Sequence, residues 1–185
     1  MASLIVFYDA NVLYPAELRN FLMHLALMGI FGARWSAKVH ESLLANRPDL
    51  SRKKLERTRE LMDKAAPDAL VVGYEHLIPQ LELPDPNDRH VLAAAIHCGA
   101  GIIVTRNLAD FPPDRLADFG IEAQHPDEFI LHLFELAPGL VIEAAENHRG
   151  SLKNPPRTAE EYIVILESQG LTQTALILRE HNRTP

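Results

Sequence analysis

Four acidic residues, well separated along the chain, are the strongest candidates for chemistry. They are Asp9, Glu41, Asp88 and Asp110. Carboxylates gathered in one place repel each other, so a fold that assembles them needs a cation to neutralise the charge. Oxygen ligands of this kind select Mg²⁺ or Mn²⁺, whereas zinc prefers His and Cys. Such an ion can activate water and stabilise a leaving oxygen, so the pattern points to phosphodiester chemistry.

The first of these acids follows a run of apolar residues that predicts a buried strand. Residues 4–8, LIVFY, are rich in β-forming residues and end directly at Asp9. A helix is predicted from Pro15 to about Gly29, because apolar residues recur at helical spacing between them. We therefore expect Asp9 and Asn11 at the carboxyl end of the strand, above this helix.

Glu41 lies in the middle of a second predicted helix, over residues 36–45. Ser36 is a suitable N-cap for this helix, and Pro48 prevents much continuation. A carboxylate in this position either faces solvent or has a strong partner, because burying it alone is costly. A further helix, predicted over 51–65, has apolar residues on one face and basic residues on the others.

The other two acids flank a helix and a strand. Asp88, or Asn87 before it, can cap a helix over residues 89–97, and the proline-rich loop before them is expected to be extended. Residues 101–105, GIIVT, predict a buried strand, and Asp110 stands in the turn after it. In an open α/β sheet, ligands bind at the carboxyl edge of the strands, where such turns gather.

The overall pattern predicts an α/β domain followed by helices. Further strands predicted at 69–74 and 121–123 complete an alternation of strands and helices, which is typical of a parallel sheet. From residue 138 onward only helical patterns occur. We therefore predict an α/β domain over residues 1–137 and a small helical extension over residues 138–185.

The helical extension contains a local signal for a helix start. Thr158 precedes an apolar run, and Glu161 stands at the spacing of a capping box. Gly170 separates this helix from a last one. An extension of about 50 residues is too small to be expected to fold alone.

Composition restricts the class of protein. A length of 185 residues with 47% hydrophobic content is sufficient for a packed core. No apolar run approaches the length of a membrane span, and the first residues lack the basic segment of a signal peptide. The single cysteine, Cys98, indicates a reducing compartment. We therefore expect a cytoplasmic protein without membrane association.

The distribution of charge is uneven. The net charge of −7 argues against a simple electrostatic nucleic-acid binder. The segment from Arg34 to Lys64, however, contains nine Lys or Arg and five Asp or Glu, so its net charge is +4. The remainder of the chain has a net charge of −11. A basic stretch beside a metal site could guide a phosphate backbone. The alternative interpretation is an ordinary solvated helix face.

Taken in order, these motifs resemble those of PIN domains. The first two are an apolar strand ending in D-A-N-V-L and a helical glutamate about thirty residues later. The next two motifs are D-x-x-V-L-A-A-A-I-x-x-G-A and I-V-T-R-N-x-x-D-F-P. The resemblance covers roughly residues 4–137. It implies a three-layer α/β fold with a central parallel sheet flanked by helices, to which the helical extension is added.

The resemblance also implies roles for the candidate residues. Asp9, Glu41 and Asp88 would hold a metal ion, and Asp110 would complete or tune the site. Many members carry an acid two residues after the threonine, where this chain has Asn107, so the fourth ligand could be Asp110, Asn107 or a water held by both. The residues with supporting or substrate-positioning roles would be Asn11, Asp85, Thr105, Arg106 and Asn107.

The implied activity is that of a Mg²⁺- or Mn²⁺-dependent endoribonuclease. Such proteins are most often the toxin of a VapC-type toxin–antitoxin pair, so RNA, a cognate antitoxin and a second copy of the chain are the expected partners. Two alternatives stay open. A receiver-like regulatory domain needs a phosphoacceptor Asp and a late Lys, and neither 71–76 nor 121–126 offers them. A PIN-like scaffold without catalysis could act as a binding module.

Overall fold

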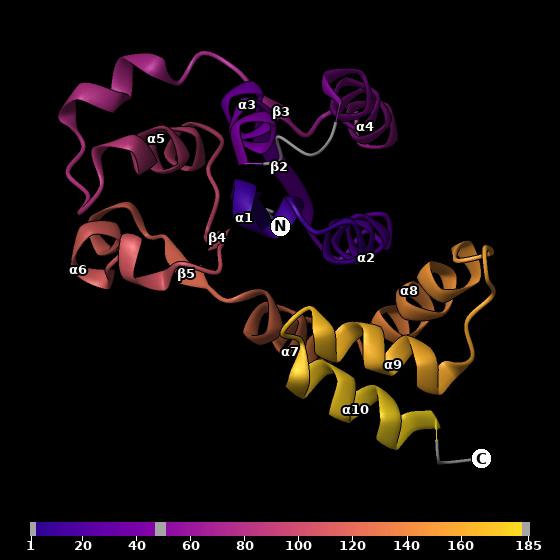
Figure 1. The fold of residues 1–185 in the computed structure, drawn as a ribbon. Helices are drawn as coiled ribbons and strands as arrows, with labels where there is room; N and C mark the ends of the chain where they lie inside the picture. Colours follow the sequence, from indigo (N-terminus) through magenta and orange to yellow (C-terminus); the bar gives the residue numbers. More distant parts are fainter. Residues whose placement is uncertain (1–2, 47–50, 183–185) are drawn as a thin grey trace. The chain divides into compact units, whose positions relative to one another are not determined.

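The computed structural model describes residues 3–46 and 51–182. Packing divides the chain into two compact units, each built from two segments. The first unit consists of Met1–Tyr14 and Phe31–His125, and the second of Pro15–Ile30 and Pro126–Pro185. Figure 1 shows the course of the chain from the indigo N-terminal strand to the yellow C-terminal helix.

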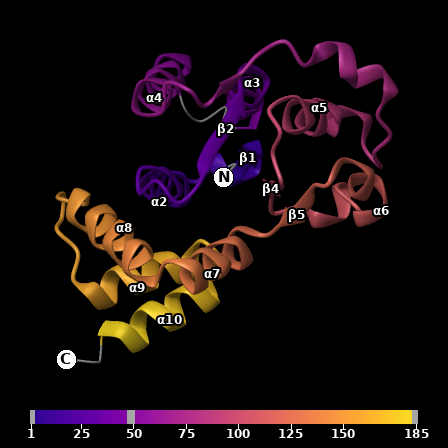
Figure 2. The same cartoon turned by 180° about the vertical axis from the view of Figure 1, so that it is seen from behind.

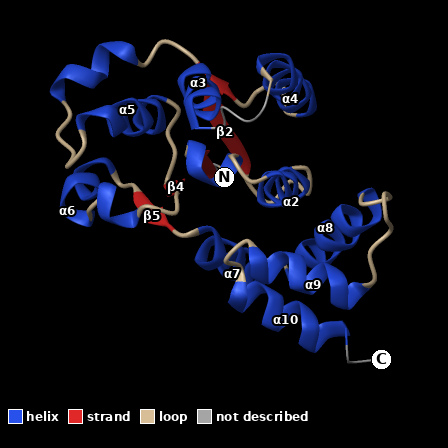
Figure 3. Cartoon of the chain, in the orientation of Figure 1, coloured by secondary structure: helices blue, strands red, loops and turns tan. Residues whose placement is uncertain are grey.

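The first unit is built on a five-stranded sheet in the order β3-β2-β1-β4-β5. Its strands are β1 (Ile5–Tyr8), β2 (Gly32–Ser36), β3 (Leu70–Val71), β4 (Ile102–Val104) and β5 (Glu122–Gln124). All neighbouring strands are parallel, and the central β1 pairs Val6 with Ala33 of β2 and with Ile102 of β4. The strands are coloured red in Figure 3.

Helices connect these strands and flank the sheet. The α-helices of this unit are α1 (Ala10–Leu13), α3 (Ala37–Asn46), α4 (Arg52–Ala65), α5 (Arg89–His97) and α6 (Pro113–Leu116). Short 3₁₀ segments are η1 (Glu75–Gln80), η2 (Pro86–Asp88), η3 (Leu108–Asp110) and η4 (Ala117–Phe119). In Figures 1 and 2, α3 lies beside β2, with which it is in contact. The predicted α/β class with a central parallel sheet is confirmed.

The centre of the sheet is apolar on both faces. Val6, Phe7 and Tyr8 of β1 are fully buried, as expected for a strand covered on both sides. The Tyr8 ring stacks on the Trp35 indole of β2, with ring centroids 6.5 Å apart and an interplanar angle of 16°. Burying aromatic and β-branched side chains in this way is the main source of stability for such a core.

Some predicted boundaries were wrong. The strand β2 was missed, because Gly, Ala, Arg and Ser are weak β-formers, and its conformation is set by pairing with β1. Within the predicted strand 69–74, only Leu70–Val71 pairs with β2. The loop 79–87, expected to be extended, instead includes parts of η1 and η2.

The second unit is entirely helical. It contains α2 (Ala16–Ala26), α7 (Pro126–Leu136), α8 (Pro138–Ser151), α9 (Ala159–Ser168) and α10 (Thr172–Asn182). Helix α2 packs on α8, α7 on α8 and α10, and α9 on α10. Two helices from before residue 138 therefore belong to this unit, whereas the domain boundary at residue 137 stays a prediction. Among the described helices, none combines the length and apolarity that crossing a membrane would require.

An aromatic cluster holds α2 against the C-terminal helices. The His148 ring of α8 stacks on Phe21 of α2 at a centroid distance of 5.8 Å, and Tyr162 of α9 meets both rings edge-on. His148 Nδ1 and the Tyr162 hydroxyl are hydrogen-bonded at 2.8 Å. Since His148 is fully buried and Tyr162 nearly so, these rings form the centre of the helical unit.

Candidate metal and active site

Asp9 stands where β1 ends and α1 begins. Its Oδ1 accepts a hydrogen bond from the Ala10 amide (2.7 Å), and its Oδ2 accepts from Asn11 Nδ2 (3.2 Å) and Thr105 Oγ1 (2.9 Å). Asp9 is only 8% exposed. Burial raises the pKa of Asp9, and the negative charge of Asp110 raises it further, while the bonds from Thr105 and Ala10 act in the opposite direction.

Asn11 and Thr105 join the ends of two neighbouring strands. Asn11 Nδ2 donates to Thr105 Oγ1 (3.0 Å), and Asn11 Oδ1 accepts from the Arg106 amide (2.9 Å). The buried Thr105 hydroxyl donates to Asp9 and also accepts from the Asn107 amide (3.2 Å). One donor and two acceptor positions of this hydroxyl are therefore in use. The network holds the Asp9 carboxylate in one orientation at the carboxyl edge of the sheet.

Two further aspartates bring their charge to this edge. Asp88 ends η2 directly before α5, and its pKa is raised to about 6 by burial first and then by the charges of Asp9, Asp110 and Asp85. Asp110, at the end of η3, is half-buried and acts on both Asp9 and Asp88. We call Asp9, Asp88 and Asp110 the acidic cluster.

The loop before α5 differs from the prediction in its capping. Either Asn87 or Asp88 was expected to cap α5. Asp88 stands at the N-cap position, but its side chain makes no capping hydrogen bond, so its carboxylate stays available. Asp85 is exposed and caps the preceding turn, with Oδ1 accepting from the Asn87 amide at 2.9 Å. Asp85 therefore supports the loop and adds to the negative potential at Asp88.

Glu41 does not join the acidic cluster in this structure. Its carboxylate lies 3.6 Å from Lys38 Nζ, one turn earlier on α3, and its side chain is 61% exposed. Its charge acts on His90 of α5. Among the residues that the structure describes, no three carboxylate, imidazole or thiol groups converge closely enough to hold a metal ion.

The structure also identifies residues near these elements that the sequence did not single out. The half-buried ring of His90, two residues after Asp88, has its pKa lowered to about 4 by burial and then by the positive charge of Lys38. Asp63 of α4 accepts a hydrogen bond from the Trp35 indole at 2.8 Å. Neither residue forms a motif in the sequence, because each acquires its neighbours only through the fold.

Positive charge is present in the same unit. Arg106 follows Thr105 at the end of β4, and partial burial lowers the pKa of its guanidinium. The exposed cations of α4 are Arg52, Lys53, Lys54, Arg57 and Lys64. Arg52 is paired with Glu56 at 3.1 Å. The first unit therefore has both an acidic strand edge and a helix with a basic surface.

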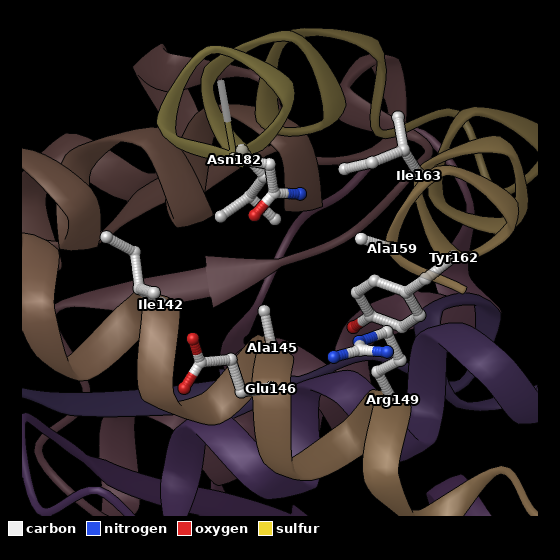
Figure 4. A pocket seen from close by; sticks show the side chains of 9 residues that line it. Ile142, Ala145, Glu146, Arg149, Ala159, Tyr162, Ile163 and Asn182 are labelled. Atoms are coloured by element: carbon white, nitrogen blue, oxygen red, sulfur yellow. The ribbon is translucent and has the colours of Figure 1, made fainter. Parts of the chain in front are cut away.

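The second unit contains a small cavity of about 60 Å³ between α8, α9 and α10. Apolar side chains such as Ile142 and Ile163 share its lining with Glu146, Arg149 and Tyr162 (Figure 4). Figure 4 shows the Tyr162 hydroxyl pointing toward the Arg149 guanidinium. Glu146 is the one acid in this lining, whereas the charges of Asp9, Asp88 and Asp110 interact at the strand edge, so the acidic cluster is the candidate active site.

Comparison with known proteins agrees with this description. Residues 5–109 match the PIN domain model, and residues 126–180 match the model of the VapC50 C-terminal domain. Over 68 residues the chain is 46% identical to "Putative ribonuclease VapC50" of Mycobacterium tuberculosis (strain ATCC 25618 / H37Rv). That match spans 37% of this chain and 40% of the relative. No solved structure gives a significant match.

The range of the PIN domain match includes the elements that form the candidate site. It begins with β1, contains Asp9, Glu41 and Asp88, and ends at residue 109, one residue before Asp110. The helical match covers α7 to α10 of the second unit. Because the PIN domain model matches more than half of the chain, the chain belongs to the PIN domain family.

Proposed function

We propose that this protein is a Mg²⁺- or Mn²⁺-dependent endoribonuclease and the toxin of a VapC-type toxin–antitoxin pair. The observation that carries the proposal is the acidic cluster at the carboxyl edge of the sheet. Burial raises the pKa of Asp9 and of Asp88, and the charge of Asp110 raises both further. Membership of the PIN domain family and the similarity to a protein named as a ribonuclease support it.

The donors at this edge fit a hard divalent cation. Asp9, Asp88 and Asp110 offer only carboxylate oxygens, the ligands that Mg²⁺ and Mn²⁺ prefer. Burial, and then the charges of Asp9, Asp110 and Asp85, raises the pKa of Asp88 to about 6, and a bound cation would offset both effects. Glu41 would join these ligands by leaving Lys38, which costs little because an exposed ion pair contributes about 1 kcal/mol or less.

We favour Asp110 over Asn107 as the fourth residue of the site. The charge of Asp110 acts on Asp9 and on Asp88. Asn107 is exposed, and it contributes its backbone amide to Thr105 Oγ1 at 3.2 Å. We therefore propose Asp9, Glu41, Asp88 and Asp110 as metal ligands, with Asn107 as a support for Thr105.

The remaining residues would orient the ligands and the RNA. A bound divalent ion would supply an activated water and charge stabilisation for phosphodiester hydrolysis. Asn11 and Thr105 would hold Asp9 in place through their hydrogen bonds. Arg106, beside this network, would contact a phosphate, and the cations of α4 would attract the RNA backbone.

The other two functions considered are less favoured. In receiver domains the first strand lies between the second and the third, whereas here β1 lies between β2 and β4. A catalytically silent binding module would have no need to keep mutually repelling carboxylates partly buried, since such charges destabilise a fold without a cation. The cognate antitoxin, homodimerisation and a cytoplasmic location stay predictions within this proposal.

Cleavage of single-stranded RNA with Mn²⁺ or Mg²⁺ tests the proposal directly. We expect metal-dependent cleavage by the wild type and its loss in Asp9→Asn and Asp88→Asn. Asp118→Asn, which changes an exposed acid of η4, is the matched control and should retain activity. A wild type that is inert toward RNA with either metal and harmless on expression would exclude the nuclease function.

A further inference from the structure

The helix that carries Glu41 places two buried side chains directly before it. Among the α3 side chains that the structure describes, Val39 and His40 are buried, at 0% and 4% exposure. Glu41 directly follows His40, so it projects from the helix about 100° further around the axis. The direction of Glu41 therefore depends on how His40 is seated.

His40 is seated against a carboxylate from another helix. Its Nε2 lies 3.6 Å from Oδ1 of Asp63, which belongs to α4. The same oxygen accepts the Trp35 indole N–H of β2 at 2.8 Å, and the ring edge of His40 faces Trp35 at a centroid distance of 6.3 Å. One carboxylate group therefore contacts residues of β2 and α3 and connects both to α4.

The position of Asp63 is itself well determined. Trp35 is fully buried and stacks on Tyr8 of β1, so its N–H points in one direction only. On the outer side, Arg59 Nε lies 3.8 Å from Asp63 Oδ2. A buried indole donor left without its acceptor is unfavourable, so Asp63 is held by more than a surface ion pair.

We propose that Asp63 is a positioning residue, which seats His40 and α3 on the sheet and thereby directs Glu41 toward the acidic cluster. This inference rests on the proposed function, since it assigns Glu41 a place among the metal ligands. It would keep Glu41, whose ion-pair partner is the exposed Lys38, near α5, where its charge already acts on His90. Asp63 acts through α3 and does not itself contact the metal or the RNA.

The first test measures Mn²⁺ affinity by titration calorimetry in a double-mutant cycle. We expect Asp63→Ala to weaken Mn²⁺ binding by about tenfold, the lower end of what lost outer contacts of a metal site cost. In a Glu41→Gln background, Asp63→Ala should cause no further loss, because Asp63 acts through Glu41. An equal loss in both backgrounds, or no loss in either, would overturn the proposal.

The second test follows α3 in the metal-free protein. Hydrogen exchange over residues 37–42 should become faster in Asp63→Ala, and the emission of Trp35, the single tryptophan, should shift. Asp63→Asn keeps an oxygen acceptor for the indole and should restore part of both signals. Asp68→Ala, which removes an exposed acid after α4, is the control and should match the wild type. Unchanged exchange in Asp63→Ala would refute the positioning role.

The two proposals fail in different ways. If wild-type protein neither binds Mn²⁺ nor cleaves RNA, the proposed function is wrong, and α3 exchange still decides whether Asp63 positions the helix. If wild-type protein cleaves RNA while Asp63→Ala keeps the wild-type kcat and α3 exchange, the positioning role is wrong and the nuclease function stands. A fall in kcat with an unchanged KM, together with faster α3 exchange, supports both.

Discussion

Two buried aspartates, one in each unit, show how the two halves of the molecule differ. Asp9 and Asp127 are both 8% exposed. Asp9 accepts hydrogen bonds mainly from side chains at the ends of two strands. Asp127, at the start of α7, accepts from the amides of Gln173 and Thr174 and from the Thr174 hydroxyl, at 3.0, 2.9 and 2.7 Å.

The surroundings of Asp127 favour its negative charge, whereas those of Asp9 disfavour it. Asp127 faces the N-terminus of α10, where unpaired amides and the helix dipole favour a negative charge. The pKa of Asp9 is raised by burial first and then by the charge of Asp110. The first arrangement stabilises the helical unit. The second is unfavourable for a charged carboxylate, which is why Asp9 is a candidate for the proposed metal site.

The largest effect should come from Asp9→Asn. We expect RNA cleavage to fall to background, whereas the free energy of unfolding should change by less than about 1 kcal/mol, because relief of repulsion offsets weaker hydrogen bonds. Cleavage assays and urea unfolding in EDTA measure the two quantities. A large loss of stability with retained cleavage would show that Asp9, like Asp127, serves the fold and not the reaction.

The opposite result is expected for Asp127→Ala. Removing the acceptor leaves two buried or half-buried amides and the Thr174 hydroxyl without their partner, which should lower the free energy of unfolding by about 3 kcal/mol. Cleavage by the protein that remains folded should be unaffected. Glu143→Ala, an exposed acid of α8, serves as the control. A change below about 0.5 kcal/mol would show that α10 does not depend on this cap.

The helical unit should lose stability in acid through His148. Burial, and then the charge of His24, lowers the pKa of His148 to about 4. Between about pH 6.5 and pH 4 the unfolded chain therefore takes up a proton that the folded chain does not, so stability falls as the pH decreases. The loss should be about 2 kcal/mol at pH 5.

His148→Gln isolates this contribution, because glutamine does not titrate and can still bond to Tyr162. Urea unfolding from pH 7.5 to pH 5 should show a shallower decline for this variant than for the wild type. Parallel curves for the two proteins would mean that His148 is protonated in the folded state.

The smallest effect is expected for Asp88→Asn in EDTA. The raised pKa of Asp88 means that its ionised form destabilises the metal-free fold above about pH 6. Asp88 is half-exposed, so solvent screening keeps the gain from removing its charge below about 1 kcal/mol at pH 7.5. The gain should vanish below pH 4, where both states are protonated. A loss of stability at pH 7.5 would argue against repulsion within the acidic cluster.

Features that depend on neighbouring residues were predictable from the sequence. The continuous apolar run of β1 and the glycine-bounded β4 were found close to their observed bounds. The capping box was confirmed: Thr158 Oγ1 accepts from the Glu161 amide at 3.2 Å, and Glu161 Oε2 accepts from the Thr158 amide at 2.8 Å. Such features need only contacts within a few residues.

Features made by distant parts of the chain were not predictable in this way. The strand β2 has weak propensity and exists because it pairs with β1 and β3. The helix after Pro15 was predicted, but its packing on α8 through Phe21 and His148 was not. The contact of Asp63 with Trp35 spans 28 residues and leaves no periodic signal in the sequence.

The sequence alone determined which acids stand at strand ends and helix starts, because hydrophobic periodicity and capping chemistry are local. Only the tertiary structure decided which of them act on each other. It brings the charge of Asp110 to Asp9 and Asp88, and it leaves Glu41 beside Lys38. The physical reason is that charge interactions depend on separation in space and on burial, which the packing of the sheet and its helices sets.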